Sequence, residues 1–126
     1  MLTYPNFDLP FILTTDASAV ALAAILSQVQ NGLKRPNAYV SRQLTKAEQA
    51  YSASEAELLS LVWASKFFRC YFDGKIFTVR TDYAALTYLG TFSDSNAKLM
   101  RWHLKKLELD FTVEHRAGTK IPLSIL

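Results

Sequence analysis

The chain has 126 residues, of which 50% are hydrophobic and 20% are charged, and its formal net charge of +3 gives only a weak indication of an anionic partner. This length can bury one core and is too short for two ordinary domains, so we expect a single domain over residues 1–126, with 1–9 as an N-terminal connection and 119–126 as an atypical tail. The composition excludes intrinsic disorder, and the absence of a long apolar run or a signal-peptide pattern predicts a soluble, intracellular protein without a membrane span.

The first elements along the chain are predicted to be three strands. Residues 11–15 (FILTT) form a β-rich run that ends at Asp16. Residues 22–29 (LAAILSQV) allow helix or strand by propensity alone. The turn signal Asn31-Gly32, followed by the run 37–41 (NAYVS), favours a hairpin of two antiparallel strands.

A long helix is predicted over residues 52–72, where apolar side chains recur at steps of three and four residues. It ends at Asp73-Gly74, because glycine readily takes a left-handed backbone position. Its start carries two overlapping capping signals, each combining a hydroxyl with a carboxylate: Ser52 with Glu55, and Ser54 with Glu57.

Several side chains in the helical segments are expected to be structural. The single cysteine, Cys70, excludes an internal disulfide and a cysteine-based zinc cluster, and we predict a buried, inert thiol. Four aromatic side chains are assigned to the core because they follow the helical spacing: Trp63, Phe67, Phe68 and Trp102.

The second half of the chain begins with a strand over residues 76–81 (IFTVRT), which ends at Asp82. A short helix over 84–89 and a longer helix from Ser95 or Asn96 are expected next, and the last strand is residues 110–115. The longer helix is predicted to be amphipathic. Its inward face comprises Leu99, Trp102, Leu104 and Leu107, and its outward face comprises Lys98, Arg101 and Lys105.

This order of elements predicts a mixed sheet covered by helices, in which ligands bind beyond the carboxyl ends of the strands. Asp16 and Asp82 lie at such ends, and Glu57 lies near the start of the long helix. If these elements are neighbours, the three carboxylates converge and their mutual repulsion requires a cation; oxygen-only ligands suit Mg²⁺ or Mn²⁺. Each residue also has a structural alternative, as a turn former or a helix cap.

Sequence blocks in order over residues 4–118 resemble the ribonuclease H domain of gypsy-type LTR retrotransposon reverse transcriptases, including FILTTDAS, the segment from AYVSRQL to RTDYAAL, and KLMRWHLKKLELDFTVEHRAG. The resemblance implies an α/β, ribonuclease H-like fold with a five-stranded mixed sheet flanked by helices, and a C-terminal helix that is missing or truncated in this chain. It also implies that Asp16, Glu57 and Asp82 are catalytic residues that bind two Mg²⁺ (or Mn²⁺) ions in an endonuclease hydrolysing the RNA strand of RNA–DNA hybrids. The implied partners are the hybrid and the polymerase domain of the same polyprotein, in the cytoplasm or in retroelement particles, or in the nucleus for a domesticated derivative.

The sequence departs from the family pattern at several positions near the expected site, including Ala21 and Ala23, which are often glycine in the family. The family's closing motif has a fourth carboxylate, an aspartate before Ala-Leu-Ser-Arg, where this chain has Ile125, and Tyr83 stands where the family usually has histidine. The change at Ile125 keeps an alternative open, a catalytically impaired or inactive domesticated module that binds nucleic acid or protein. The tail is itself apolar, which predicts a homodimer or partner contact through Ile121, Leu123, Ile125 and Leu126.

Basic side chains provide the candidate grip on nucleic acid. Lys98, Arg101 and Lys105 form a ridge at helical spacing, and Arg42 and Arg80 are candidate neighbours. The alternative for each is a solvated surface. Two histidines are assigned packing or surface roles, since proton transfer needs a placed partner: His103 and His115.

Overall fold

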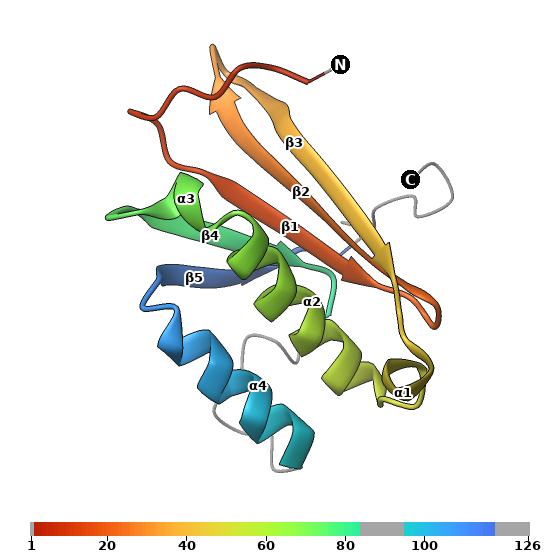
Figure 1. Ribbon diagram of the computed structural model, residues 1–126. Helices are drawn as coiled ribbons and strands as arrows, with labels where there is room; N and C mark the ends of the chain where they lie inside the picture. The colour runs from red at the N-terminus through yellow and green to blue at the C-terminus, as the bar shows by residue number, and fades with distance from the viewer. Residues whose placement is uncertain (1, 84–94, 118–126) are drawn as a thin grey trace.

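Five strands form one mixed sheet in the computed structural model, which describes residues 2–83 and 95–117 (Figure 1). In their order across the sheet they are β3 (Leu33–Gln43), β2 (Ala21–Gln30), β1 (Ile12–Ala17), β4 (Ile76–Thr81) and β5 (Asp110–His115). β1, β2 and β3 pair antiparallel, whereas β1, β4 and β5 pair parallel. The predicted α/β class with a five-stranded mixed sheet is therefore confirmed.

The β2–β3 hairpin turns at the predicted Asn31-Gly32. Both residues have positive φ, 54° and 80°, which is the backbone of the type I′ turn that matches the twist of the flanking strands. β3 is longer than the predicted run 37–41 and continues through Pro36. A proline without an N–H is tolerated there because β3 lies at the edge of the sheet, and the register shifts beside it.

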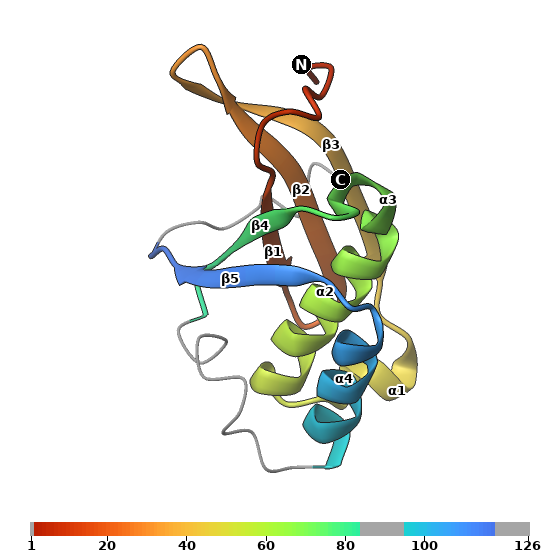
Figure 2. The ribbon, with the colours of Figure 1, turned by 90° about the vertical axis from the view of Figure 1, so that its left-hand side faces the viewer.

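Four helical segments belong to the described part of the chain: α1 (Lys46–Gln49), α2 (Ala53–Phe67), α3 (Arg69–Phe72) and α4 (Ser95–Lys106). α2 lies across one face of the sheet, and α4 packs beside α2 on the same face (Figures 1 and 2). α1 was not predicted, although Thr45 and Glu48 form a capping box at its start.

The predicted helix 52–72 is divided into α2 and α3 at Phe68, whose backbone (φ −97°, ψ 15°) departs from helical values. Its start is as predicted, because Ser52 and Glu55 form the reciprocal hydrogen bonds of a capping box. Its end is also as predicted, since Gly74 has a positive φ of 68°.

The core lies between α2 and the sheet. Leu13 of β1, Leu26 of β2 and Val79 of β4 are fully buried in one cluster with Leu58 and Leu61 of α2. Burial of each leucine stabilises the fold by about 1.5–3 kcal/mol. This cluster fixes α2 on the sheet and thereby fixes the position of polar residues next to it in α2.

Some predicted core positions are wrong. Trp102 and Leu99 of α4 are 52% and 53% exposed, whereas Leu104 is buried as predicted and Met100, which was not predicted, is buried as well. The inward stripe of α4 is rotated by about one residue, because contact with α2 and the sheet sets which side of the helix is covered. Phe67 is 59% exposed for the same kind of reason, since its neighbour Phe68 fills the core.

Three expectations fall on residues outside the described ranges: the short helix 84–89, the tail 119–126 with its predicted dimer contact, and the position of Ile125. Within the described ranges, none of the helices has both the length and the apolar character that a membrane crossing requires.

Candidate metal centre

Three carboxylates from separate elements meet at one end of the sheet. Asp16 belongs to β1, Glu57 to α2, and Asp82 follows β4 directly. One carboxylate oxygen from each of the three lies within 4.8 Å of the other two. The structure thus brings together the residues that the sequence singled out for metal binding.

The parallel pairing of β1 and β4 explains why the two aspartates meet. The register pairs Thr14 with Arg80, and its continuation brings Asp16 level with Asp82. The sequence suggested that Asp16 follows the first strand. In the structure Asp16 lies within β1, because the strand continues there and pairs Asp16 with Ala23 of β2.

The electrostatic environment favours a cation at this point. Asp16 and Glu57 are buried, with exposed fractions of 4% and 7%, and Asp82 is half-buried. Ionised carboxylates that are close and shielded from water repel one another unless a cation neutralises them. The donors are oxygen atoms alone, a set that suits Mg²⁺ or Mn²⁺ better than softer metals. The residues present therefore fit a divalent metal site.

Hydrogen bonds fix the backbone around Asp82. The backbone N–H of Tyr83 donates to Thr81 Oγ1 at 3.0 Å, and His115 Nε2 is hydrogen-bonded to the backbone carbonyl of Asp82 at 3.1 Å. The hydroxyl groups of Tyr83 and Ser54 are 2.8 Å apart and share a hydrogen bond. Sequence reasoning missed the contacts of His115 with Asp82 and of Tyr83 with Ser54, because each joins segments that lie far apart along the chain.

A small cleft opens beside Glu57. It lies between the turn that leaves β1 and the start of α2, and its lining comprises Ala17, Ser18, Ala19, Gln49, Tyr51, Ser52, Ala53, Ala56 and Glu57. Most of these side chains are small, the exceptions being Gln49, Tyr51 and Glu57 itself.

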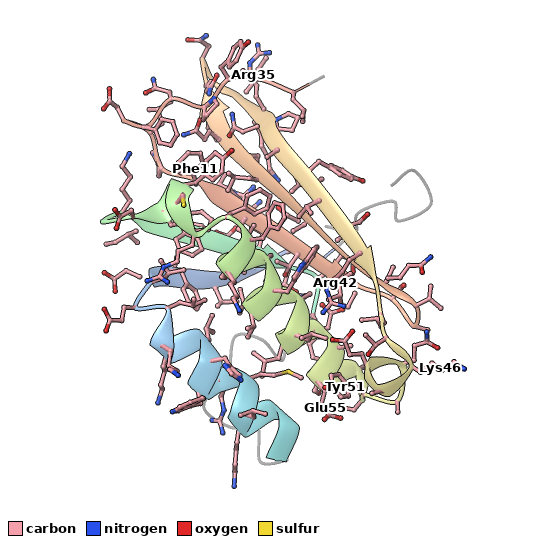
Figure 3. The ribbon with its side chains drawn as sticks, in the orientation of Figure 1. Phe11, Arg35, Arg42, Lys46, Tyr51 and Glu55 are labelled. Atoms are coloured by element: carbon pink, nitrogen blue, oxygen red, sulfur yellow. The ribbon has the colours of Figure 1, made fainter. Side chains whose placement is uncertain are left out.

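Two of the five predicted nucleic-acid contacts are engaged with carboxylates. Arg42 of β3 (Figure 3) binds Glu48 of α1 through two hydrogen bonds of 2.7 and 2.9 Å, which lower the pKa of the Glu48 carboxyl to about 2. Arg80 of β4 lies 3.5 Å from Glu114 of β5. The pKa of Glu114 is lowered chiefly by its hydrogen bond from Arg116, with a smaller contribution from Arg80.

The other three predicted contacts line a common groove between α4 and β5. Lys98, Arg101 and Lys105 lie around a floor that is largely apolar and comprises Trp102, Leu104, Leu109 and Phe111. The Nζ of Lys106 lies 4.1 Å from the centroid of the Trp102 ring, a cation–π contact. The exposed ring of His103 packs against that of Trp102, with the two ring centroids 5.2 Å apart.

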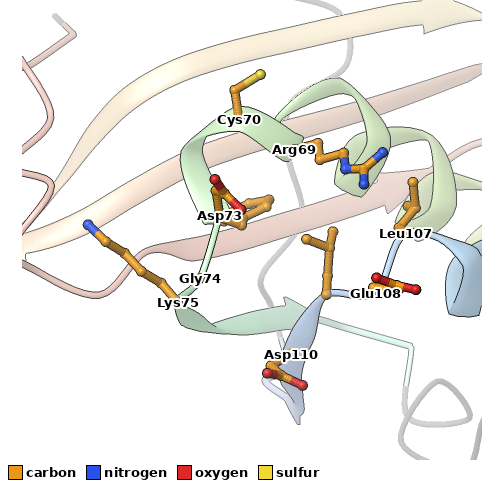
Figure 4. A pocket seen from close by; sticks show the side chains of 10 residues that line it. Arg69, Cys70, Asp73, Gly74, Lys75, Leu107, Glu108 and Asp110 are labelled. Atoms are coloured by element: carbon orange, nitrogen blue, oxygen red, sulfur yellow. The ribbon is translucent and has the colours of Figure 1, made fainter.

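A further hollow lies at the opposite end of β4, where α3 meets the start of β5 (Figure 4). Its charged lining is mixed in sign and comprises Arg69, Asp73, Lys75, Glu108 and Asp110. Within the described residues these acids do not converge on one point as the three carboxylates do. Cys70 also lines this hollow and is exposed, so the predicted buried thiol is wrong; α3 turns Phe72 to the core instead.

Relatives of known sequence are Pol polyproteins of LTR retrotransposons. The chain is 46% identical over 118 residues to the retrovirus-related Pol polyprotein from transposon 412 of Drosophila melanogaster, and 41% identical over 103 residues to that from transposon gypsy of the same organism. These alignments cover 94% and 81% of this chain and 10% of each polyprotein, so the chain spans about a tenth of the length of the curated relatives it matches.

Solved structures share the fold at low sequence identity. The foamy viral protease-reverse transcriptase dRH in complex with ds DNA aligns with a TM-score of 0.75 and 18% identity, over 96% of this chain and 22% of that one. LC11-RNase H1 in complex with an RNA/DNA hybrid aligns with a TM-score of 0.68 and 12% identity, over 86% of both chains. The fold is therefore ribonuclease H-like.

The family model for the RNase H-like domain found in reverse transcriptase matches residues 6–108, which is most of the chain. The resemblance to gypsy-type elements that the sequence blocks indicated is confirmed by the retrotransposon relatives. The chain therefore belongs to the family of RNase H-like domains found in reverse transcriptase.

Proposed function

We propose that this domain hydrolyses the RNA strand of RNA–DNA hybrids and requires divalent metal ions to do so. The observation that carries the proposal is the convergence of Asp16, Glu57 and Asp82, with oxygens within 4.8 Å, in a family whose members belong to reverse transcriptases. Structural neighbours support the substrate class, since LC11-RNase H1 and the foamy viral enzyme have both been solved with an RNA/DNA hybrid.

The three carboxylates would hold Mg²⁺ or Mn²⁺, and we propose two ions. Bound there, such ions supply an activated water and stabilisation of the leaving 3′ oxygen, the chemistry of a two-metal site. The fold itself must hold the three carboxylates close together and oriented for metal binding. Apolar side chains of α2 that are buried in the core hold this helix on the sheet. Hydrogen bonds of Tyr83 and His115 fix the backbone around Asp82.

The hybrid would be gripped through its phosphates. Lys98, Arg101 and Lys105 share one groove, so they can contact successive phosphates without reading sequence. Arg42 and Arg80 are each paired with a carboxylate, Glu48 and Glu114 respectively, so we assign them a smaller share of the binding. Discrimination of RNA from DNA would rest on the 2′-hydroxyls. The polymerase domain of the same polyprotein is the proposed protein partner, in the cytoplasm or in retroelement particles.

The test is cleavage of a hybrid with a labelled RNA strand in the presence of Mg²⁺ or Mn²⁺. The wild type is expected to cut the RNA strand, and Asp16→Asn to lose at least two orders of magnitude in rate, because an amide is a poorer ligand for a hard cation. Asp110→Asn, which removes an exposed carboxylate outside the cluster, is the matched control and should cut like the wild type. Metal-independent cleavage, or equal cleavage by Asp16→Asn, contradicts the proposal.

A second candidate function rests on the resemblance to gypsy-type domains, which implies a fourth carboxylate where this chain has Ile125. In this case the domain binds nucleic acid or protein but is catalytically impaired. The variant Ile125→Asp separates the two functions. Restoration of cleavage in Ile125→Asp alone supports an impaired module, whereas cleavage by the wild type supports the nuclease.

A further inference from the structure

A hydrogen bond joins the two elements that carry Glu57 and Asp82. The hydroxyl of Tyr83, the residue directly after Asp82, lies 2.8 Å from the hydroxyl of Ser54, which is one helical turn before Glu57. Asp82 is adjacent to Tyr83, and Glu57 lies on the same helix as Ser54. This single contact therefore restrains the spacing between α2 and the residues that follow β4.

Ser54 takes no part in the capping box of α2. The cap is made by Ser52 and Glu55, whose side chains bond each other's backbone N–H groups at 3.2 and 2.9 Å. The sequence suggested that Ser54 forms a second capping box with Glu57. In the structure the Ser54 hydroxyl is instead hydrogen-bonded to the Tyr83 hydroxyl. Removal of the Ser54 hydroxyl should therefore leave the start of the helix intact.

Tyr83 is held so that its hydroxyl reaches Ser54. Its ring is half-buried against the hydrophobic core, and its backbone N–H is bonded to Thr81 Oγ1 at 3.0 Å. On the other side of the same peptide, His115 Nε2 holds the Asp82 carbonyl from β5. The backbone at Asp82 is thus tied to β4 and β5, and the Tyr83 hydroxyl supplies the tie to α2.

We propose that Tyr83 and Ser54 are positioning residues, which set the distance between Asp82 and Glu57 and so the affinity of the site for divalent metal. This inference rests on the proposed metal-binding function. Like charges push the α2 and β4 ligands apart in the metal-free protein, and the hydrogen bond opposes that separation. Without the bond, metal must draw the ligands together, so its apparent affinity falls.

The test is Mn²⁺ binding, measured by the loss of the free-ion EPR signal during titration. Tyr83→Phe and Ser54→Ala are each expected to bind Mn²⁺ about tenfold more weakly than the wild type, the usual scale for residues that orient metal ligands. The double variant should bind no more weakly than either single variant, because both remove one shared bond. Ser54→Thr retains a hydroxyl and should restore affinity close to that of the wild type.

Tyr39→Phe is the matched control, because the Tyr39 hydroxyl is buried on β3 and has no hydrogen-bond partner in the described part of the chain. It should leave Mn²⁺ affinity unchanged. Circular dichroism and thermal unfolding confirm that each variant is folded. Unchanged affinity in Tyr83→Phe, or additive losses in the double variant, overturns this inference and leaves the proposed function standing. A wild type that fails to bind Mn²⁺ overturns both.

Discussion

Asp16 of β1 and Asp82 after β4 stand level with each other across a parallel strand pair. The pairing of Thr14 with Arg80 sets this level, and Glu57 approaches the same point from α2. The hydrophobic core beneath α2 and the hydrogen bonds around Asp82 hold the three carboxylates together. The metal-free fold therefore contains a repulsion that the surrounding structure overcomes.

This repulsion predicts that Asp16→Asn stabilises the protein in the absence of metal. Removal of one of three neighbouring charges should raise the free energy of unfolding by about 1 kcal/mol, since like charges in a cleft disfavour one another. For a chain of this length that corresponds to a melting temperature about 3–6 °C higher. Thermal unfolding in excess EDTA measures the effect, and the same variant should lose most of the stabilisation that saturating Mg²⁺ gives the wild type.

Asp110→Asn provides the comparison, because Asp110 is exposed and stands outside the cluster. It should change neither the melting temperature in EDTA nor the response to Mg²⁺. If Asp16→Asn melts below the wild type in EDTA, the carboxylate at position 16 is stabilised by its surroundings rather than repelled by its neighbours.

The ion pair of Arg42 and Glu48 predicts a pH-dependent contribution to stability. The folded pKa of Glu48 is about 2, below the ordinary value of 4.5, so its contribution is complete above about pH 4.5 and is lost as the pH falls toward 2. Glu48→Gln should lower the free energy of unfolding at pH 7 by about 1–2 kcal/mol, allowing for screening by solvent. Urea unfolding between pH 3 and pH 7 should show the difference from the wild type shrinking as the pH falls.

Asp8→Asn, which removes an exposed carboxylate near the N-terminus, serves as the reference for general charge effects. Its difference from the wild type should stay small at every pH. A loss in Glu48→Gln that is the same at pH 3 as at pH 7 would show that the contribution is not electrostatic.

Local signals allowed the sequence to predict the elements that carry the site. The capping box of Ser52 and Glu55 and the turn Asn31-Gly32 act through residues a few positions apart, so their effects can be read from short stretches of sequence. The convergence of Asp16 and Asp82 was expected from the carboxylate cluster that the family resemblance implied, because spacing alone left each residue open to a structural role.

Contacts between distant segments could not be predicted. Sequence offers Glu57 as the partner of Ser54, three residues away, but the fold provides Tyr83, at a separation of 29 residues. α4 likewise turns Met100 rather than Trp102 to the core, because the space left by α2 and the sheet decides the rotation of the helix. Hydrophobic spacing indicates that a helix is amphipathic and fixes its inward face only to within about one residue.

The backbone conformation of Glu108, outside the site, leads us to predict that its replacement by glycine stabilises the protein. It follows α4 with a φ of 53°, a left-handed backbone conformation that costs a side chain about 1–2 kcal/mol. Glu108→Gly removes this cost and adds the conformational entropy of glycine in the unfolded chain, so we expect a net gain of about 0.5 kcal/mol in the free energy of unfolding. Chemical denaturation measures it, with Glu108→Ala as the control that removes the carboxylate but keeps the backbone cost. A gain of equal size in Glu108→Ala would assign the effect to charge.

The groove between α4 and β5 predicts how hybrid binding depends on salt. Lys98 and Lys105 are exposed and line this groove, so each should neutralise a phosphate and release a counterion. Lys98→Gln and Lys105→Gln should each weaken binding and reduce the slope of log affinity against log salt by about 1. Lys46→Gln is the control, because Lys46 is exposed on α1 and points away from the body of the molecule (Figure 3). The measurement is fluorescence anisotropy with a labelled hybrid in Ca²⁺, which fills oxygen sites without supporting rapid cleavage. An unchanged slope in both groove variants would place the path of the hybrid elsewhere on the domain.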